Sequence, residues 1–226
     1  MNDVIIRQFK TIQPYHDTWE AMKIFTNQRS TETTDEIWLL EHLPVFTQGL
    51  AGKPEHVLNP HHIPIVQTDR GGQITYHGPG QLMVYLLLDI RRLGLQTRTF
   101  VRTIEQIVVD YLKSLKIEAY GKEDAPGVYV DEAKICSIGL RVKRGFSYHG
   151  LAFNIDLDLT PFSYINPCGF KGLQITQVKD RALTITMDQV MQNIMPYFLN
   201  HFGYNHPKIL QDLPLEMPSH EQQVNL

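Results

Sequence analysis

A cysteine in the second half of the chain lies in a context that suits a nucleophile. Cys168 follows Asn166-Pro167 and precedes Gly169, a sequence typical of an irregular turn rather than of a strand. Such a turn leaves a thiol partly exposed, as a nucleophile requires. An ordinary cysteine, with a pKa of ~8.5, is mostly protonated at neutral pH. If Cys168 reacts, a cation or a base must therefore lie beside it.

Three residues could supply that group. Lys134 follows the acidic pair Asp131-Glu132, and on its own it is most simply a solvated lysine. A lysine at the rim of a pocket could instead stabilise a thiolate by its charge, or act as a base where burial lowers its pKa. His77 and His149 each lie between a tyrosine and a glycine, and a Cys–His pair is the commoner arrangement. Spacing alone does not choose among the three.

The second cysteine fits a structural role. Cys136 lies within Lys134–Leu140, an alternating strand, and is most simply a small core residue. The chain contains two cysteines and no CxxC or HExxH spacing, so we expect no metal site and no cofactor. A disulfide is not expected in a reducing compartment.

The segment Arg70–Gln81 concentrates polar side chains and glycines between two apolar runs. It holds four glycines and one proline, and Ile63–Val66 precedes it while Leu82–Leu88 follows it. Glycine either adopts backbone angles that other residues avoid or lets a ligand approach the main chain. We therefore expect a polar pocket edge mounted on a buried sheet. Two tight turns with incidental polar residues are the alternative.

Composition limits the possible classes of function. The chain has 226 residues, 42% of them hydrophobic, and a net charge of −3, so it has enough apolar material for a core and no global charge that favours nucleic acid or an anionic membrane. No apolar run approaches the ~20 residues of a membrane span. The N-terminus lacks the pattern of a signal peptide. We expect a cytoplasmic protein with one catalytic domain over 1–213 and a polar tail over 214–226.

The periodicity predicts an α+β fold, with a mixed, largely antiparallel sheet flanked by helices. Apolar residues at helical spacing predict three helices, Pro14–Gln28, Thr99–Leu115 and Thr186–Phe202. Extended segments are predicted at Val4–Phe9, Glu36–Glu41, Ile63–Thr68, Gln73–His77, Leu82–Leu88, Gly127–Val130, Lys134–Val142 and Phe146–Asn154. Several of these strands follow one another without a helix, which excludes a strictly alternating parallel sheet.

Six blocks of sequence together resemble the octanoyltransferases, the lipoyl(octanoyl) transferase family of lipoate synthesis. They occur in order between Glu36 and Val178, and no single block would suffice. The blocks are Leu40–Gly49, Arg70–Gln81, Pro126–Tyr129, Lys134–Gly139, His149–Asn154 and Ile165–Gly169. One departure follows the last block, where the family usually has a Thr-Ser pair and this chain has Thr176 and Gln177.

The resemblance implies a fold shared with biotin and lipoate protein ligases, and a two-step acyl transfer through a cysteine thioester. By motif, Cys168 corresponds to the nucleophile and Lys134 to its activating lysine, with His149 as a possible supporting residue. The substrate pocket would then be formed by Arg70, Gly71, Gly72, Gln73, Ile74, Thr75, Tyr76, His77, Ser137, Ile138, Gly139, Gly150, Leu151 and Ala152. Backbone N–H groups of Cys168, Gly78 and Gly80 are candidates for the oxyanion hole.

The resemblance also implies the partners. The donor would be octanoyl-acyl carrier protein, and the acceptors would be lipoyl domains of 2-oxoacid dehydrogenase complexes and the glycine-cleavage H protein. Carrier proteins are acidic, so we expect a basic patch at the pocket mouth, with Arg141, Lys143 and Arg144 as candidates beside a hairpin turn.

Three other functions remain as alternatives. They are an ATP-dependent lipoate or biotin ligase, a cysteine acyl hydrolase that uses His77 or His149, and a module that only binds acyl chains or carrier protein.

Overall fold

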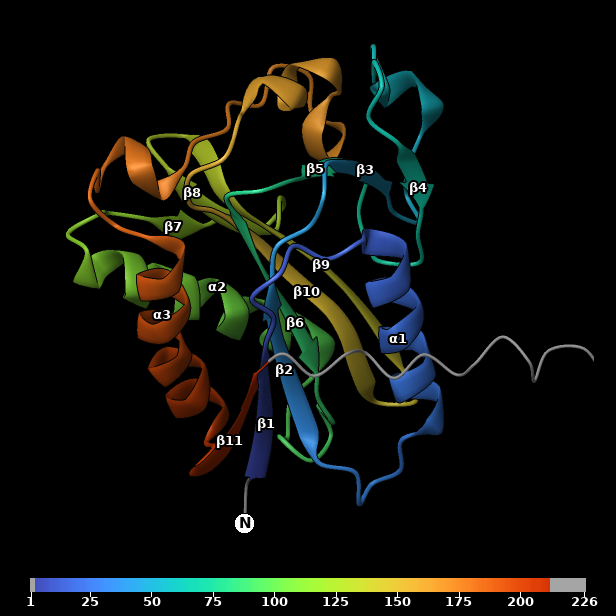
Figure 1. Cartoon of the computed structure of the whole chain (residues 1–226), viewed down its shortest axis with the longest axis vertical. Helices are drawn as coiled ribbons and strands as arrows, with labels where there is room; N and C mark the ends of the chain where they lie inside the picture. The colour runs from blue at the N-terminus through green and yellow to red at the C-terminus, as the bar shows by residue number, and fades with distance from the viewer. Residues whose placement is uncertain (1–2, 212–226) are drawn as a thin grey trace, which may run out of the picture.

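An eight-stranded mixed sheet forms the centre of the molecule (Figure 1). The structure, a computed structural model, describes residues 3–211. The strand order is β11-β1-β2-β6-β10-β9-β8-β7; β1 pairs in parallel with β11 and β2, and the other pairs are antiparallel. The strands are β1 (Asp3–Gln8), β2 (Asp35–Leu40), β6 (Gln81–Leu87), β7 (Tyr120–Gly121), β8 (Gly127–Val130), β9 (Ala133–Lys143), β10 (Phe146–Asn154) and β11 (His206–Gln211).

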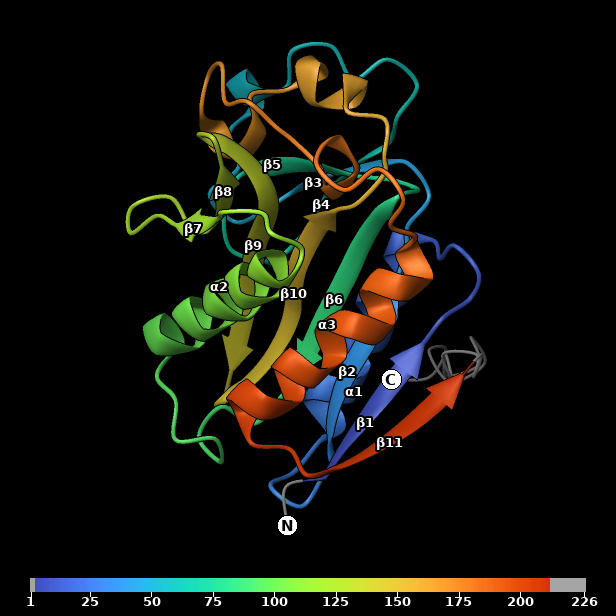
Figure 2. The ribbon, with the colours of Figure 1, turned by 90° about the vertical axis from the view of Figure 1, so that its left-hand side faces the viewer.

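A small three-stranded sheet lies at one end of the large sheet (Figures 1 and 2). Its order is β4-β3-β5, with β3 (Val45–Gln48), β4 (Ile65–Gln67) and β5 (Ile74–His77). Short 3-10 helices lie at the same end of the molecule: η1 (Pro54–His56), η2 (Thr160–Tyr164), η3 (Pro167–Gly169) and η4 (Val178–Asp180). This end of the molecule carries the candidate site.

Helices cover both faces of the large sheet. α2 (Thr97–Ser114) and α3 (Met187–Phe202) pack together on one face, and α1 (Tyr15–Gln28) covers the other (Figures 1 and 2). The predicted capping box of α3 is present, because Thr186 and Gln189 each accept a backbone N–H of the other. The helix continues through Pro196 and ends where Gly203 adopts a φ of 70°.

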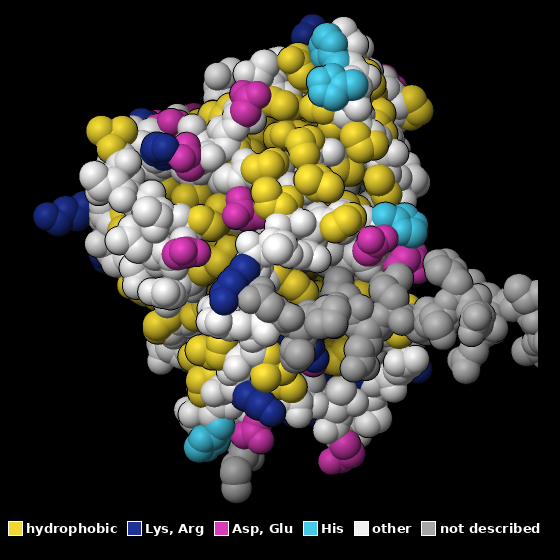
Figure 3. All heavy atoms as spheres, in the orientation of Figure 1, with side chains coloured by type: hydrophobic (Ala, Val, Ile, Leu, Met, Phe, Trp, Pro, Cys, Tyr) yellow, Lys and Arg dark blue, Asp and Glu magenta, His cyan; other side chains and the backbone are white. Residues whose placement is uncertain are grey.

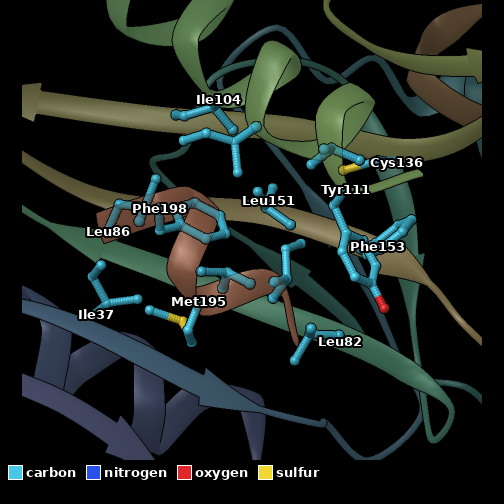
Figure 4. Close-up of a cluster of buried hydrophobic side chains, with 14 of the residues drawn as sticks. Ile37, Leu82, Leu86, Ile104, Tyr111, Cys136, Leu151, Phe153, Met195 and Phe198 are labelled. Carbon is cyan, nitrogen blue, oxygen red and sulfur yellow. The ribbon is translucent and has the colours of Figure 1, made fainter. Parts of the chain in front are cut away.

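The main core lies between the sheet and the pair α2 and α3 (Figure 4). Ile104 of α2 and Phe198 of α3 meet Leu151 of β10 there, all of them fully or almost fully buried. Cys136 belongs to this core with 0% of its surface exposed, which confirms its predicted structural role.

The predicted fold class is confirmed, and the predicted helices and strands are present with small shifts at their ends. The strand predicted at Ile63–Thr68 is shorter, since β4 begins after Pro64, which has no N–H to donate to a ladder. Sequence reasoning missed β3, β7 and β11, which are a four-residue strand, a two-residue strand and an exposed edge strand. The predicted tail, 214–226, lies outside the described residues.

No helix among residues 3–211 is long and apolar enough to cross a membrane.

Candidate active site

Cys168 and Lys134 meet at the end of the sheet, although 34 positions separate them in the chain. The Lys134 Nζ lies 3.3 Å from the Cys168 Sγ and donates a second hydrogen bond to the Pro126 carbonyl at 3.1 Å. Cys168 is partly exposed, whereas only 2% of Lys134 is exposed. The structure thus pairs the cysteine with the lysine, one of the three partners that the sequence left open.

The turn that carries Cys168 is fixed on both sides. Before it, the Asn166 N–H donates to the His56 carbonyl at 2.8 Å. After it, the chain returns alongside β9, where the Lys134 N–H donates to the Gln174 carbonyl and the Thr176 N–H to the Lys134 carbonyl. Cys168 itself has a φ of 56°, in the left-handed region. Strand β9 and the cysteine turn therefore hold each other in register.

Lys134 is charged in a buried place. Burial acts to lower the pKa of Lys134, but the charges and hydrogen bonds of Cys168 and Tyr129 outweigh it, so the pKa is raised. Among the ion pairs of residues 3–211, none links Lys134 to a carboxylate. The Lys134 Nζ, 3.3 Å from the sulfur, is close enough to exchange a proton with a group bonded to that sulfur.

Glycine at position 127 leaves room for the lysine. Gly127 has a φ of 139°, and a Cβ there would lie 3.1 Å from the Lys134 Cε and 2.6 Å from the Cys136 carbonyl oxygen. A larger residue would push the Lys134 side chain away from Cys168. The close approach of Lys134 therefore explains why the sequence block Pro126–Tyr129 has a glycine at position 127.

A cavity of about 330 Å³ opens beside the Cys168–Lys134 pair. Its floor is formed by small residues on two neighbouring strands: Gly139 of β9 is paired with Gly150 of β10, and Ser137 with Ala152. The loop that contains Arg70 lies against this floor, because the Gly71 N–H donates to the Leu140 carbonyl at 2.9 Å. Small side chains facing a crossing loop leave a slot suited to a slender apolar ligand.

Most of the predicted pocket residues line this cavity. Those present are Arg70, Gly71, Gly72, Gln73, Thr75, His77, Ser137, Ile138, Gly139, Gly150, Leu151, Ala152 and His149. Ile74 and Tyr76 do not line it, and their substrate contacts stay predictions. Side chains alternate along β5, and while Thr75 and His77 face the cavity, Ile74 and Tyr76 pack in a separate apolar cluster.

The two histidines have hydrogen-bond partners other than the Cys168 sulfur. The His77 Nδ1 bonds the Gln81 Oε1 at 2.7 Å and its Nε2 bonds the Thr47 hydroxyl at 3.0 Å. The His149 Nε2 donates to the Asp69 carboxylate at 2.9 Å. Burial lowers the pKa of both rings. Both line the cavity as neutral walls, and no hydrogen bond in the described chain links either to Cys168.

Arg70 shapes the loop around it. The guanidinium is buried and donates to the Thr47 hydroxyl at 3.1 Å, and to the carbonyls of Gly71 and Gln73 at 2.8 Å each. Arg70 therefore fixes the wall of the slot.

Other lining residues were not found from the sequence. They are Tyr15, Met83, Tyr85, Thr97, Val101, Asp124, Ala125, Pro126, Leu140 and Phe170. Pro126 begins one sequence block and Phe170 lies two residues after Cys168, so proximity to a motif could have indicated both. Asp124 and Ala125 directly precede the Pro126–Tyr129 block, and Leu140 directly follows the Lys134–Gly139 block, so the same proximity applies to them. The rest come from α1, α2 and β6, which only the tertiary fold brings together. No group of three His, Cys, Asp or Glu residues in 3–211 could hold a metal ion.

One oxyanion-hole candidate is already engaged. The Gly80 N–H donates to the Glu41 carboxylate at 2.6 Å, and neither Gly78 nor Gly80 lines the cavity. The Cys168 N–H stays a prediction.

Two of the three residues predicted as a basic patch at the pocket mouth, Lys143 and Arg144, lie away from the cavity, whereas Arg141 follows the lining residue Leu140 and its carrier contact stays a prediction. The turn between β9 and β10 lies at the opposite end of these strands, beside the end of α1 (Figure 1). There the Lys143 Nζ donates to the Asn27 side chain at 2.8 Å and Arg144 to the Asn27 carbonyl at 3.0 Å. Lys143 lies nine positions after Lys134 along β9, roughly 30 Å at the usual rise.

Comparison with known proteins identifies the family to which the chain belongs. The lipoyl protein ligase A/B catalytic domain matches residues 14–199. An octanoyltransferase of Coxiella burnetii is 66% identical over 216 residues, which are 96% of this chain and 89% of that protein. The chain belongs to the octanoyltransferase family. Another member, from Chromobacterium violaceum, is 56% identical and covers 84% of this chain and 91% of its own length.

Solved structures with this fold include more distant members of the wider ligase group. A putative lipoate protein ligase from Thermoplasma acidophilum aligns with a TM-score of 0.77 over 95% of this chain and 91% of that chain, at 15% identity. A lipoate-protein ligase A bound with ATP aligns with a TM-score of 0.78 over the same shares, at 14% identity. Identities this low establish the fold alone, and they confirm the predicted ligase-like architecture.

The departure from the octanoyltransferase pattern has a local role. The Gln177 Oε1 accepts the Leu157 N–H at 2.8 Å, and its Nε2 donates to the Asp180 carboxylate at 3.2 Å. Gln177 therefore caps η4 and ties it to the segment that follows β10, and its side chain does not line the cavity.

Proposed function

We propose that the protein transfers an octanoyl group from octanoyl-acyl carrier protein to a lysine of a lipoyl domain, through a thioester on Cys168. The single observation that carries the proposal is the 3.3 Å contact between the Lys134 Nζ and the Cys168 Sγ at the mouth of an acyl-sized slot. The names of the relatives at 56–66% identity support the acyl group.

In the first step the Cys168 thiolate attacks the carbonyl carbon of the donor thioester. A new carbon–sulfur bond forms, and the bond to the donor sulfur breaks when the tetrahedral intermediate collapses. The Lys134 ammonium gives its proton to the departing thiolate, which leaves as a thiol. Cys168 then carries the acyl group, and Lys134 is a neutral amine.

In the second step the neutral amine of the acceptor lysine attacks the same carbonyl carbon. The bond to the Cys168 sulfur breaks, and the sulfur leaves as a thiolate. The attacking nitrogen loses one proton to the Lys134 amine and becomes an amide. The ammonium–thiolate pair of the resting enzyme is thereby restored. Since the donor is already a thioester, the sequence of steps needs no ATP.

The slot provides a place for the hydrocarbon chain. Cavity walls near the cysteine include Val101 and Phe170, and the floor is formed by Ser137, Gly139 and their strand partners. Burial of each methylene contributes about 0.8 kcal/mol, so a medium-length chain can bind tightly.

The site gives less support to the alternatives. A hydrolase that uses His77 or His149 would need one of them at the sulfur, and both are bonded elsewhere. A ligase forms an adenylate and needs no cysteine beside a buried lysine. A module that only binds would need no ammonium aimed at a thiol.

The acceptor must approach the exposed side of Cys168. Figure 3 shows hydrophobic side chains gathered on the upper part of one face, over the small sheet and the neighbouring loops. In those loops Leu50, Leu58 and Phe170 are exposed apolar residues. We infer that a lipoyl domain, from a 2-oxoacid dehydrogenase complex or the glycine-cleavage H protein, contacts this rim. A cytoplasmic location stays a prediction.

The test is a transfer assay without ATP. The protein is mixed with octanoyl-acyl carrier protein and an isolated lipoyl domain, and the intact mass of the domain is followed. We expect one octanoyl amide per domain. Release of free octanoate with an unmodified domain would indicate a hydrolase. Modification that requires octanoate and ATP would indicate a ligase.

A further inference from the structure

Unpartnered polar atoms collect around the slot. Among the described residues, seven buried side-chain nitrogen or oxygen atoms have no hydrogen-bond partner. Three of them belong to the cavity-lining residues Tyr15, Gln73 and His149, and a fourth is the hydroxyl of Thr68, close to Tyr15. Such atoms are rare in folded proteins, and a concentration of them at one cavity points to a ligand that supplies the missing bonds.

Tyr15 and His149 line the cavity, and Thr68 lies beside Tyr15; these three residues are called the far end of the slot. The His149 Nε2 donates to Asp69, a carboxylate that also accepts from Trp19 and Tyr148, so the ring carries its proton on Nε2. Its Nδ1 is then a hydrogen-bond acceptor without a donor. His149 has a φ of 59° within a strand, an uncommon conformation that holds the ring at this place.

The hydroxyl of Tyr15 complements that acceptor. Its ring stacks on the His77 ring with centroids 5.8 Å apart and planes 3° from parallel, which fixes where the hydroxyl lies. Burial raises the pKa of Tyr15 to about 12, so the hydroxyl keeps its proton and can donate. The Thr68 hydroxyl is near enough to interact, although neither hydroxyl has a partner that meets hydrogen-bond geometry.

The register of the sheet gives the length of the slot. Gly127 marks the near end of the slot, because a Cβ added to it would lie 3.3 Å from the Lys134 Nζ. Gly127 is paired with Ser137 of β9. His149 is paired with Leu140, three residues farther along β9. Three residues of strand span roughly 10 Å. An extended chain of eight carbons spans roughly 9 Å at ordinary carbon–carbon bond lengths. An acyl chain of eight carbons on Cys168 is therefore long enough to reach the level of His149 in the sheet.

We propose that the far end of the slot is a hydroxyl-binding site, and that the enzyme accepts acyl chains with a hydroxyl on the eighth carbon as a second class of substrate. A hydroxyl is both donor and acceptor, so it can donate to the His149 Nδ1 and accept from the Tyr15 hydroxyl at once. A purely apolar pocket rejects a hydroxyl because its hydrogen bonds to water are lost on burial. The inference rests on the proposed octanoyl transfer.

The experiment compares two donors in the same assay, the octanoyl and the 8-hydroxyoctanoyl thioesters of pantetheine. For each enzyme variant we take the ratio of the two values of kcat/KM, hydroxyoctanoyl over octanoyl. The wild type is expected to use the hydroxylated donor within about fivefold of octanoyl. Tyr15→Phe removes only the hydroxyl and keeps the ring on His77, and it should lower the ratio at least tenfold. Thr68→Val, a nearly isosteric change, should lower it less.

The matched control is Tyr111→Phe. Tyr111 also has a buried hydroxyl without a partner, but it lies in the core between the sheet and α2 and does not line the cavity. Its ratio should equal that of the wild type. A wild-type ratio already as low as that of Tyr15→Phe would overturn the inference, and so would equal ratios in all variants. Absence of octanoyl transfer by the wild type would instead refute the proposed function, so the two failures are distinguishable.

Discussion

The two ends of the slot differ in charge and in the structure that holds them. At the near end an ammonium faces a partly exposed sulfur in the short 3-10 turn η3. At the far end neutral rings and hydroxyls lie inside the sheet and under α1, almost fully buried. The near end must exchange protons and admit two partners in succession, whereas the far end only has to recognise one chain. The difference separates residues that control rate from residues that control selectivity.

The largest effect is expected at the near end. Lys134→Met keeps a long side chain and removes the charge, so the sulfur loses the ammonium that stabilises it and the group that moves the proton. General acid–base groups contribute roughly 10²–10⁴-fold, and we expect a loss of octanoyl transfer in that range. Alkylation of Cys168 by iodoacetamide at pH 7 should also slow. Lys179→Met changes an exposed lysine paired with Asp156 and serves as the control. Equal rates in both variants would contradict the role of Lys134.

A smaller effect is expected from filling the slot. Ala152→Leu adds a branched side chain to the floor, opposite Ser137 on β9. The octanoyl donor should lose about 10–100-fold in kcat/KM while an acetyl donor loses less, because Ser137 is level with Gly127 near Lys134 and only the longer chain must pass the new side chain. Competition between the two thioesters measures this directly. Equal losses for both donors would mean that the chain does not lie on this floor.

The core beside Tyr15 should lose stability in acid, because the buried His42 ring packs against Tyr15 there. His42 has 0% of its surface exposed and bonds the Tyr85 hydroxyl at 2.7 Å, and burial lowers its pKa to about 4. The unfolded chain, with an ordinary histidine pKa of ~6.5, binds the proton first as the pH falls, so stability is lost between about pH 6.5 and pH 4. By pH 5 the loss from this one group is about 2 kcal/mol.

Urea unfolding at pH 7 and at pH 5 measures that loss. A His42→Gln variant should show a smaller difference between the two pH values than the wild type. If the free energy of unfolding fell by the same amount in both proteins, a group other than His42 would bind the proton.

The smallest effect is expected far from the slot. Lys143→Glu reverses a charge at the turn between β9 and β10, where the lysine donates to Asn27 of α1. Because this turn is remote from Cys168, the rate with octanoyl-acyl carrier protein should change less than twofold, at low as well as at moderate salt. A large, salt-dependent loss of this rate would instead support the contact between Lys143 and the carrier protein that was predicted from the sequence.

Sequence reasoning succeeded where residues act through local context. Glycines and polar side chains in Arg70–Gln81 indicated a pocket edge, and the Pro-Cys-Gly turn indicated an accessible thiol. Both follow from backbone preferences that neighbouring residues determine. Periodicity likewise predicted the helices, because one apolar stripe packs against one sheet.

Sequence reasoning failed where the outcome depends on how elements pair. Ile74 and Tyr76 belong to the right strand but to its other face, and only the sheet register decides which face meets the slot. The choice of Lys134 over a histidine depends on a bridge to Ile175, 41 positions away by residue number. Lys143 was misplaced because the length of β9 carries its end away from the site.

The most direct test of the account is the intact mass of the protein after it is mixed with octanoyl-acyl carrier protein and no acceptor. The account predicts one octanoyl adduct, absent in Cys168→Ser, retained in Cys136→Ala, and passed to a lipoyl domain added afterwards. An adduct that persists in Cys168→Ser, or octanoylation of the lipoyl domain by that variant at the wild-type rate, would contradict it.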